Sequence, residues 1–245
     1  MYNLAVGCLF KNESHCMAEW LDHYIFHGVD HFYMINDNST DNFLSILQPY
    51  IDNHIVSLFQ AVNWNYYIGR QRDMYNTFIL PHIKETKWLL MVDLDEFVWS
   101  PRDINLNAIL NNCNHLGQLQ IFDTLFGSNG HISQPSSLVN NFTMREKIPR
   151  RYYKYFVNSN FAFSSLNVHH ATFIDKNHEK NNFIILDETH YIINHYCCQS
   201  KEFWDNIKCS RGDSDNYLIR TSDDFVKLDK NEVEDLRLME QNKFF

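Results

Sequence analysis

Three carboxylates stand within four residues at the end of an apolar segment. Asp93, Asp95 and Glu96 follow the segment Trp88–Val92 directly. An apolar run of this length is typical of a strand that is buried on both faces of a parallel sheet. Open α/β sheets bind ligands beyond the carboxyl ends of such strands. Asp93 and Asp95 could both reach one hard cation, because Mg²⁺ takes oxygen ligands and bridges substrate phosphates. The motif alone favours a strand that ends in a polar turn over a metal site.

Two further loops carry acids and amides directly after predicted strands. Asn12 and Glu13 follow the strand Asn3–Phe10, and Asp37 follows the strand His31–Ile35. The carboxyl ends of neighbouring parallel strands lie on one rim of a sheet, so these side chains are expected to meet the Asp93 segment. Acids that contact a base and ribose, and acids that hold a cation on a diphosphate, need this arrangement. The three loops together predict a nucleotide-plus-metal site.

The elements that must position these residues alternate between strand and helix. The predicted elements are a strand at Asn3–Phe10, a helix over Met17–Ile25 that Gly28 ends, a strand at His31–Ile35, a helix at Phe43–Leu47 stopped by Pro49, a strand at Ile55–Phe59, a helix at Asp73–Glu85 that Arg70 and Gln71 open, and a strand at Trp88–Val92. This alternation predicts a parallel sheet with right-handed crossovers. The chain contains neither a Gly-x-Gly-x-x-Gly fingerprint nor a Walker A motif.

Beyond Pro101 the alternation decays into short segments. Here the predicted elements are a helix at Ile104–Leu110, strands at Gln118–Phe122, Tyr152–Val157, Leu166–Phe173, Phe183–Leu186 and Tyr191–His195, a helix at Ser200–Cys209, and a last amphipathic helix that includes Val233, Leu236 and Met239. The chain is thus expected to form one α/β domain with a regular first half and an irregular second half.

Composition and charge exclude some classes of partner. The 245 residues are 44% hydrophobic with a formal net charge of −9, which suits one globular domain. Nucleic acid is not an expected partner, because phosphate binding needs a basic surface. An anionic membrane surface is unfavoured for the same reason, although a local patch leaves room for peripheral membrane association. Without 18 consecutive apolar residues or the features of a signal peptide, a cytoplasmic location is expected. The oligomeric state stays open.

Several motifs together resemble glycosyltransferase family 92 and the related family 2-like group. They occur in matching order: Lys11-Asn-Glu13, Glu19-Trp-Leu21, Gly28-Val-Asp30, Asp93-Leu-Asp-Glu-Phe97, Phe126-Gly-Ser-Asn-Gly-His131 and Asn194-His-Tyr196. The resemblance implies a GT-A-like α/β fold, with a Rossmann-like half, a mixed, mainly parallel sheet and an irregular acceptor half. It divides the single domain of residues 1–245 into a nucleotide-sugar-binding half (1–100), an acceptor half (101–230) and a C-terminal helix or tail (231–245).

The activity that the resemblance implies is an inverting hexosyl transfer. The donor would be a nucleotide-diphosphate sugar, expected to be a UDP-sugar, with Mn²⁺ or Mg²⁺ as cofactor and a glycan or glycolipid as acceptor. The frequent use of Asn and Ile and the lack of an expected membrane anchor fit a bacterial or viral protein better than a Golgi enzyme. Two alternatives stay open: a non-catalytic nucleotide- or sugar-binding module on the same fold, and a metal-dependent phosphohydrolase.

The same resemblance assigns roles to individual residues. The metal ligands would be Asp93, Asp95 and His195, with His169 and His170 as rivals to His195. The nucleotide base and ribose would be held by Asn12, Glu13 and Asp37, with Asp93 reaching the ribose or the metal. Apart from the resemblance, Arg70, Gln71 and Arg211 are also expected on the nucleotide side. Glu96 would brace the turn. Lys154 could neutralise the diphosphate together with Arg211, although a position on the surface is the expectation for Lys154.

An inverting transfer also needs a base that takes the proton of the acceptor hydroxyl. Four residues are candidates, namely Asp123, His131, Asp213 and Asp215, of which Asp215 and His131 are preferred. Asp123 stands where members of the family often carry Trp, and could place an extra carboxylate in the site.

Overall fold

Helices and strands alternate along the first half of the computed structural model, which describes residues 1–149, 152–212, 214–215 and 219–244. The elements up to the carboxylate motif and just beyond it are β1 (Tyr2–Phe10), α1 (Ser14–Phe26), β2 (His31–Asn36), α2 (Phe43–Asp52), β3 (Val56–Gln60), α3 (Arg70–Phe78), the 3₁₀ helix η1 (Leu80–Glu85), β4 (Thr86–Met91) and β5 (Glu96–Trp99).

The second half contains shorter elements. They are α4 (Asn107–Leu110), β6 (Gln118–Leu125), α5 (Leu138–Asn141), β7 (Met144–Arg145), β8 (Tyr153–Asn158), β9 (Phe163–Leu166), β10 (Ala171–Phe173), α6 (Lys176–Asn181), β11 (Phe183–Leu186), β12 (Ile192–His195), α7 (Lys201–Phe203), the π-helical segment η2 (Trp204–Lys208), α8 (Ser222–Leu228), β13 (Val233–Glu234), α9 (Arg237–Gln241) and η3 (Asn242–Phe244).

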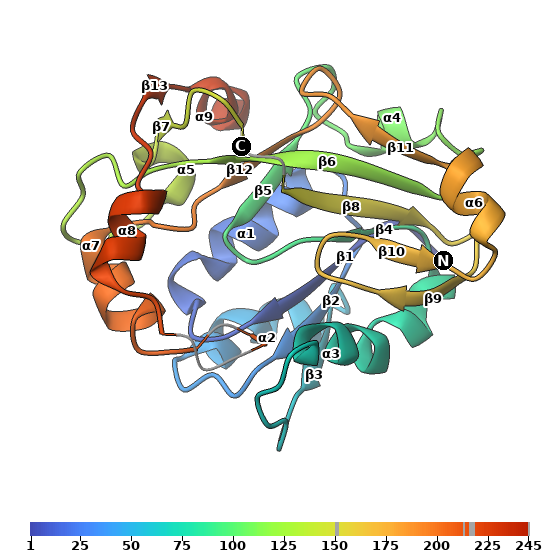
Figure 1. The fold of residues 1–245 in the computed structure, drawn as a ribbon, viewed down its shortest axis with the longest axis horizontal. Coiled ribbons are helices and arrows are strands. Elements are labelled where there is room, and N and C mark those ends of the chain that lie inside the picture. The colour runs from blue at the N-terminus through green and yellow to red at the C-terminus, as the bar shows by residue number, and fades with distance from the viewer. Residues whose placement is uncertain (150–151, 213, 216–218, 245) are drawn as a thin grey trace.

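One mixed sheet of nine strands runs through the described part of the molecule (Figure 1). Its order is β3-β2-β1-β4-β8-β6-β12-β5, with β11 beside β6. Five of its neighbouring pairs are parallel, namely β1–β2, β2–β3, β1–β4, β6–β11 and β6–β12. Three pairs are antiparallel, namely β4–β8, β6–β8 and β5–β12. The predicted GT-A-like organisation, a Rossmann-like half and a mixed, mainly parallel sheet, is confirmed in these respects.

Hydrophobic layers cover both faces of the first half of this sheet. Successive side chains of β1 point to opposite faces, so that Val6 and Cys8 belong to one buried cluster and Ala5 and Leu9 to the other. The first cluster includes side chains of α1 and α2, and the second includes those of α3 and η1. In the part of the chain that the structure describes, no helix is long and apolar enough to cross a bilayer.

Two predicted helices differ from the observed ones at prolines. Pro49 was expected to stop a helix at Leu47, but α2 continues to Asp52 with Pro49 inside it. The side chains of Tyr50 and Ile51 pack against the core beyond the proline, which offsets the hydrogen bond that proline cannot donate. The single helix expected over Asp73–Glu85 is instead divided into α3 and η1, and the second begins at Leu80 beside Pro81.

Two strand predictions and one helix prediction differ from the observed structure. Strand β5 was missed, because its four residues follow the carboxylates at once and pair only with β12, almost a hundred residues later. The single strand expected over Leu166–Phe173 is a pair of antiparallel strands, β9 and β10. The last amphipathic helix is shorter than predicted, since Val233 lies in β13, which pairs with β7, and helix α9 begins only at Arg237.

Gly127 is tightly packed, and this generates a first prediction. A Cβ atom at Gly127 would collide with the backbone carbonyl of Lys230, whereas Gly130 (φ +76°) has open space around it. We expect Gly127→Ala to lower the free energy of unfolding by about 3 kcal/mol, as overpacking does. Gly130→Ala should cost only about 1 kcal/mol, from its left-handed backbone. Urea denaturation measures both, and equal losses would contradict the packing argument.

Candidate active site

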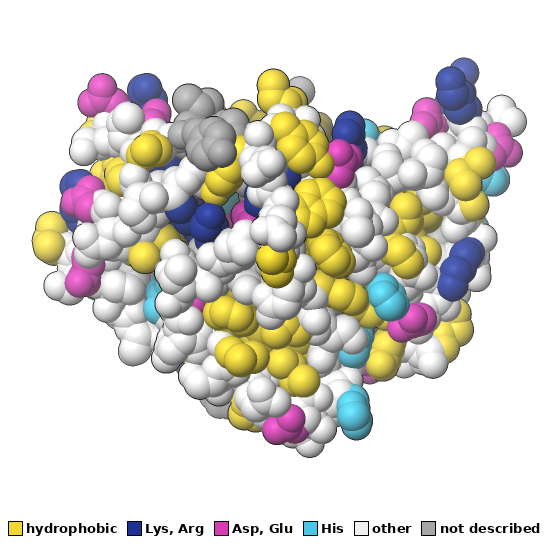
Figure 2. All heavy atoms as spheres, turned by 90° about the horizontal axis from the view of Figure 1, so that it is seen from below, with side chains coloured by type: hydrophobic (Ala, Val, Ile, Leu, Met, Phe, Trp, Pro, Cys, Tyr) yellow, Lys and Arg dark blue, Asp and Glu magenta, His cyan; other side chains and the backbone are white. Residues whose placement is uncertain are grey.

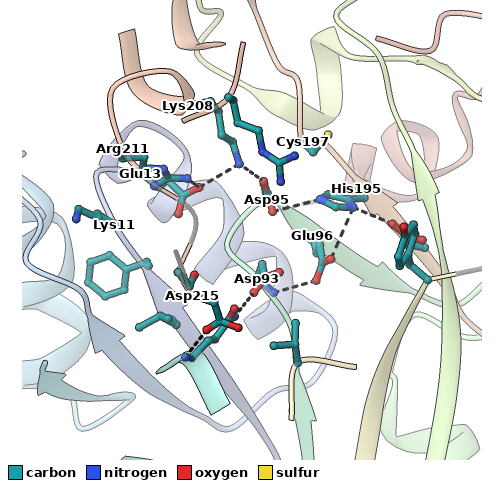
Figure 3. Close-up of a pocket in the computed structure, with 18 of the residues that line it drawn as sticks. Lys11, Glu13, Asp93, Asp95, Glu96, His195, Cys197, Lys208, Arg211 and Asp215 are labelled. Atoms are coloured by element: carbon teal, nitrogen blue, oxygen red, sulfur yellow. Dashed lines mark hydrogen bonds and ion pairs between the residues drawn. The ribbon is translucent and has the colours of Figure 1, made fainter. Parts of the chain in front are cut away.

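A cavity of about 730 Å³ lies at the carboxyl ends of β1, β2 and β4. The parallel register sets Phe10 beside Asn36 and Gly7 beside Met91, so the polar segments that follow these strands meet there. Most of the predicted site residues line the cavity: Glu13, Asp37, Gln71, Asp93, Asp95, Asp123, His195, Arg211 and Asp215. Figure 3 shows six of them, Glu13, Asp93, Asp95, His195, Arg211 and Asp215, around the cavity. On the face drawn in Figure 2, basic and acidic side chains lie together in a hollow.

A lysine neutralises the first carboxylate of the motif. Glu96 braces the turn as expected, because its Oε2 accepts a hydrogen bond from the Asp93 N–H at 2.9 Å. Lys154 Nζ lies 2.6 Å from Asp93 Oδ2 and 3.4 Å from Glu96 Oε2. The side chain of Lys154 is only 4% exposed, so the expectation of a surface position was wrong. The antiparallel pairing of β8 with β4 places Tyr155 beside Met91, and this brings Lys154 to the motif.

The second carboxylate, Asp95, lies between a histidine and a lysine. His195 Nε2 is 3.6 Å from Asp95 Oδ1, and Lys208 Nζ donates to Asp95 Oδ2 at 2.8 Å. On the other side of the imidazole, Nδ1 donates to Asp123 Oδ2 at 2.9 Å. The register of β12 against β5 sets His195 opposite Glu96. Thus the strand that sequence reasoning missed, β5, is what brings His195 to the motif.

These contacts shift the pKa values of the groups involved. Burial opposes ionisation of Asp95, but Lys208 and His195 outweigh it and hold the pKa of Asp95 well below its usual range. Burial also opposes protonation of His195, yet the carboxylate of Asp95 and the hydrogen bond to Asp123 raise the pKa of His195 to about 10. Burial raises the pKa of Glu96 to about 7. The centre of the site is therefore a set of charged groups that compensate one another.

At the end of β2 that faces the cavity, a buried ion pair joins Asp37 to Arg70. The guanidinium donates from both terminal nitrogens to the carboxylate, and its Nη1 also donates to the Ser214 carbonyl at 2.8 Å. Next to it, the Gln71 N–H donates to Asp215 Oδ1 at 2.7 Å. The start of α3 thereby connects the rim of the sheet to the segment that follows η2.

At the opposite end of the same segment, Arg211 reaches back to the first half of the chain. Its Nη2 donates to Glu13 Oε1 at 2.8 Å. Residues on both sides of Gly212 thus contact the rim formed by the first half of the chain.

Some of the predicted site residues lie elsewhere. Asn12 supports the loop geometry, since its Oδ1 accepts from the Thr40 N–H at 2.7 Å, and it lines a separate cavity of about 350 Å³. His131 donates from Nε2 to the Asn141 carbonyl at 3.1 Å, and it lines neither of these two cavities. Of the histidine rivals, His169 lines the main cavity, whereas His170 is not among the residues that line it. Asp213 lies outside the described residues.

Lys208 is the site residue that sequence reasoning missed. It is the last residue of the π-helical segment η2, and nothing in the local pattern of this helix distinguishes it from a surface lysine. π-Helical turns occur frequently at functional sites, but they cannot be recognised from residue types. Only the contact with Asp95 identifies Lys208.

Two of the three predicted metal ligands fit a divalent cation. The described residues contain no group of three or more His, Cys, Asp or Glu side chains arranged to hold a metal. Asp95 and His195 nevertheless face each other, and Asp123 holds the second ring nitrogen, as carboxylates commonly do for metal-binding histidines. A Mg²⁺ ion on a diphosphate needs only one or two protein carboxylates, since water and phosphate supply its other ligands. Asp93 is bound to Lys154, as Asp95 is to Lys208, but no histidine is paired with Asp93 in the described residues.

Comparison with known proteins shows the family to which the sequence belongs. The sequence model of glycosyltransferase family 92 matches residues 4–235. A glycosyltransferase family 92 protein of Ricinus communis is 24% identical over 220 residues, which cover 84% of this chain and 36% of that protein. The chain thus spans about a third of the length of the curated relative that it matches.

Solved structures share parts of the architecture at low sequence identity. S. aureus TarS 1-349 in complex with UDP-GlcNAc is 15% identical with a TM-score of 0.47, over 92% of this chain and 64% of that chain. HddC from Yersinia pseudotuberculosis is 10% identical with a TM-score of 0.42, over 78% of this chain and 93% of that chain. The assignment of the chain to a family therefore rests on the match to the family's sequence model, and not on these structures.

The Asp37–Arg70 pair generates a second prediction. Both side chains are almost fully buried, at 4% and 1% exposure, while Arg72 on the same helix is 48% exposed beside Asp73. Arg70→Met leaves a buried carboxylate without its partner, and we expect it to lower the free energy of unfolding by about 3 kcal/mol. Arg72→Met should cost much less than Arg70→Met, because an exposed ion pair contributes little to stability. Urea unfolding compares them, and similar losses would contradict this difference.

Proposed function

The chain belongs to glycosyltransferase family 92, and we propose that it transfers a sugar from a nucleotide-diphosphate donor to a hydroxyl of a glycan or glycolipid, with inversion. We take a UDP-sugar as the donor. The observation that supports this most is the meeting of Asp95, His195 and Asp215 in one cavity, beside the Asp37–Arg70 pair. A volume of about 730 Å³ is within the range of small-molecule sites.

In this proposal the two halves of the chain contribute different functions. Residues 1–100 would bind the nucleotide through Glu13, Asp37 and the start of α3, and residues 101–230 would supply His195, Arg211 and Asp215 and receive the acceptor. Residues 231–245, which include α9, would complete the fold. The cavity draws residues from both of the first two segments, which supports treating them as one catalytic domain.

The cofactor would be Mn²⁺ or Mg²⁺, held by Asp95 and His195. When bound, such an ion stabilises the negative charge of a departing diphosphate. Asp123 would act through His195 as a positioning residue, because its carboxylate fixes the proton on Nδ1 and so orients Nε2. Asp93, which holds Lys154 in place, would keep that ammonium at the edge of the cavity.

Asp215 is our choice for the base. It lines the cavity, and its Oδ1 is oriented by the Gln71 N–H. In an inverting transfer the acceptor hydroxyl loses its proton to the base as its oxygen bonds to the anomeric carbon and the bond to the diphosphate breaks. Asp123 is committed to His195, so it is less suited to this role. His131 is held at the Asn141 carbonyl.

Asp95 generates a third prediction. We expect Asp95→Asn to lower sugar transfer and donor hydrolysis by about a thousandfold, as losing charge stabilisation at a reacting centre does. Release of UDP from UDP-sugars measures turnover, and the thermal shift by UDP with and without Mn²⁺ measures binding. Circular dichroism checks the fold, and the exposed Asp52→Asn is the control. Unchanged turnover in Asp95→Asn would overturn the metal assignment.

Asp215 and Asp123 generate a fourth prediction, because their assigned roles differ. Asp215→Asn should lower kcat by about 10²–10⁴-fold without changing the apparent affinity for the donor, as loss of a general base does. Asp123→Asn should instead raise the Mn²⁺ concentration needed for half-maximal activity about 10–100-fold, as losing the partner of a metal-binding histidine does. Steady-state kinetics over a Mn²⁺ series separates the two, and the reverse pattern would exchange the roles.

A further inference from the structure

Lys208 forms an ion pair with Asp95, the carboxylate that would bind the proposed divalent cation. Its Nζ donates to Asp95 Oδ2 at 2.8 Å, and the two side chains are 17% and 6% exposed. The only other carboxylate within ion-pair distance of Lys208, among the described residues, is Glu13, with Oε1 at 4.0 Å. Lys208 thus provides the positive charge that compensates a nearly buried carboxylate.

Two further cations of the cavity are engaged in the same way, whereas Lys11, which also lines it, donates to the Tyr66 hydroxyl at 2.8 Å. Lys154 is bound to Asp93 and Glu96, and Arg211 is bound to Glu13. A nucleotide diphosphate brings several negative charges into this cavity, and it is held more strongly if one of the cations now paired with a carboxylate becomes available. The question is therefore which cation can leave its carboxylate.

We propose that Lys208 responds to the metal: it neutralises Asp95 in the metal-free protein, and it passes to the diphosphate of the donor once a divalent cation is bound to Asp95. This inference rests on the proposed function, because it assumes that Asp95 is a metal ligand. Repulsion between the divalent cation and the ammonium group supplies the driving force, since two like charges a few ångströms apart in a partly buried site repel strongly.

Its geometry makes Lys208 better suited to this exchange than Lys154. Lys154 is 4% exposed and held by two carboxylates, so its release would leave both uncompensated. Lys208 is held closely by one carboxylate, ends a short π-helical segment and has its flexible side chain in the cavity. Glu13 lies 4.0 Å from its Nζ, which gives the ammonium a second contact on the nucleotide side.

Such an exchange couples the binding of metal and donor. Without the donor, Lys208 competes with the metal for Asp95 and weakens metal binding. With the donor present, Lys208 has a new partner and the competition ends. The donor therefore strengthens metal binding, and by linkage the metal strengthens donor binding by the same factor.

The test is a calorimetric titration of Mn²⁺ into the whole protein without donor, followed by UDP titrations with and without Mn²⁺. We expect Lys208→Met to bind Mn²⁺ about tenfold more tightly than the wild type, because the competing charge is gone. We also expect the gain in UDP affinity caused by Mn²⁺ to be about tenfold smaller in this variant, as linkage requires. An unchanged or weaker Mn²⁺ affinity in Lys208→Met would overturn the inference.

Three controls separate this inference from the proposed function. Lys201 lies in the same helical region and pairs with Asp205 outside the cavity. Lys201→Met should therefore leave the affinities for Mn²⁺ and UDP unchanged. Lys208→Arg keeps a positive charge beside Asp95 and should keep Mn²⁺ affinity within about twofold of wild type, which excludes a general effect of disturbing η2. Asp95→Asn should abolish Mn²⁺ binding. Wild-type protein that binds no Mn²⁺ would overturn the metal assignment itself, whereas binding that is indifferent to Lys208 overturns only the exchange.

Discussion

The site depends on one physical constraint, which is the unfavourable free energy of burying several carboxylates close together at the rim of the sheet. Asp95, Glu96 and Asp123 are each less than 5% exposed, and a buried charge without a partner is strongly destabilising. The fold meets this constraint by surrounding the carboxylates with basic groups from other elements. Lys154 comes from β8, His195 from β12 and Lys208 from η2.

This constraint explains why the irregular second half is needed. The first half supplies acids at the ends of parallel strands, and the second half supplies most of the cations that compensate them. The antiparallel strands β8 and β5 are what bring the two sets together, since β8 pairs with β4 and β5 pairs with β12. In our proposal a site assembled in this way responds to a cofactor, because a divalent cation and a basic side chain would bind the same carboxylate.

Sequence reasoning was most accurate where the pattern is local. The alternation of strand and helix through β4 follows from apolar periodicity within each element and from turns rich in Asn, Asp and Gly between them. Both signals are local in the sequence. Sequence reasoning failed at α2, where core packing of Tyr50 and Ile51 overrides the proline signal, and at β5, whose partner strand is distant in the chain. The same holds for Lys154, which looks like a surface residue until β8 is paired with β4.

The sequence by itself determined the α/β class, the family and the carboxylates that line the cavity, because strand ends and their polar loops are encoded side by side. Only the tertiary structure decided what each of these groups contacts. It bound Asp93 to Lys154 and Asp95 to Lys208, and it turned Asp123 toward His195. The physical reason is that the partner of a buried charge is set by strand register and helix position, which no local pattern records.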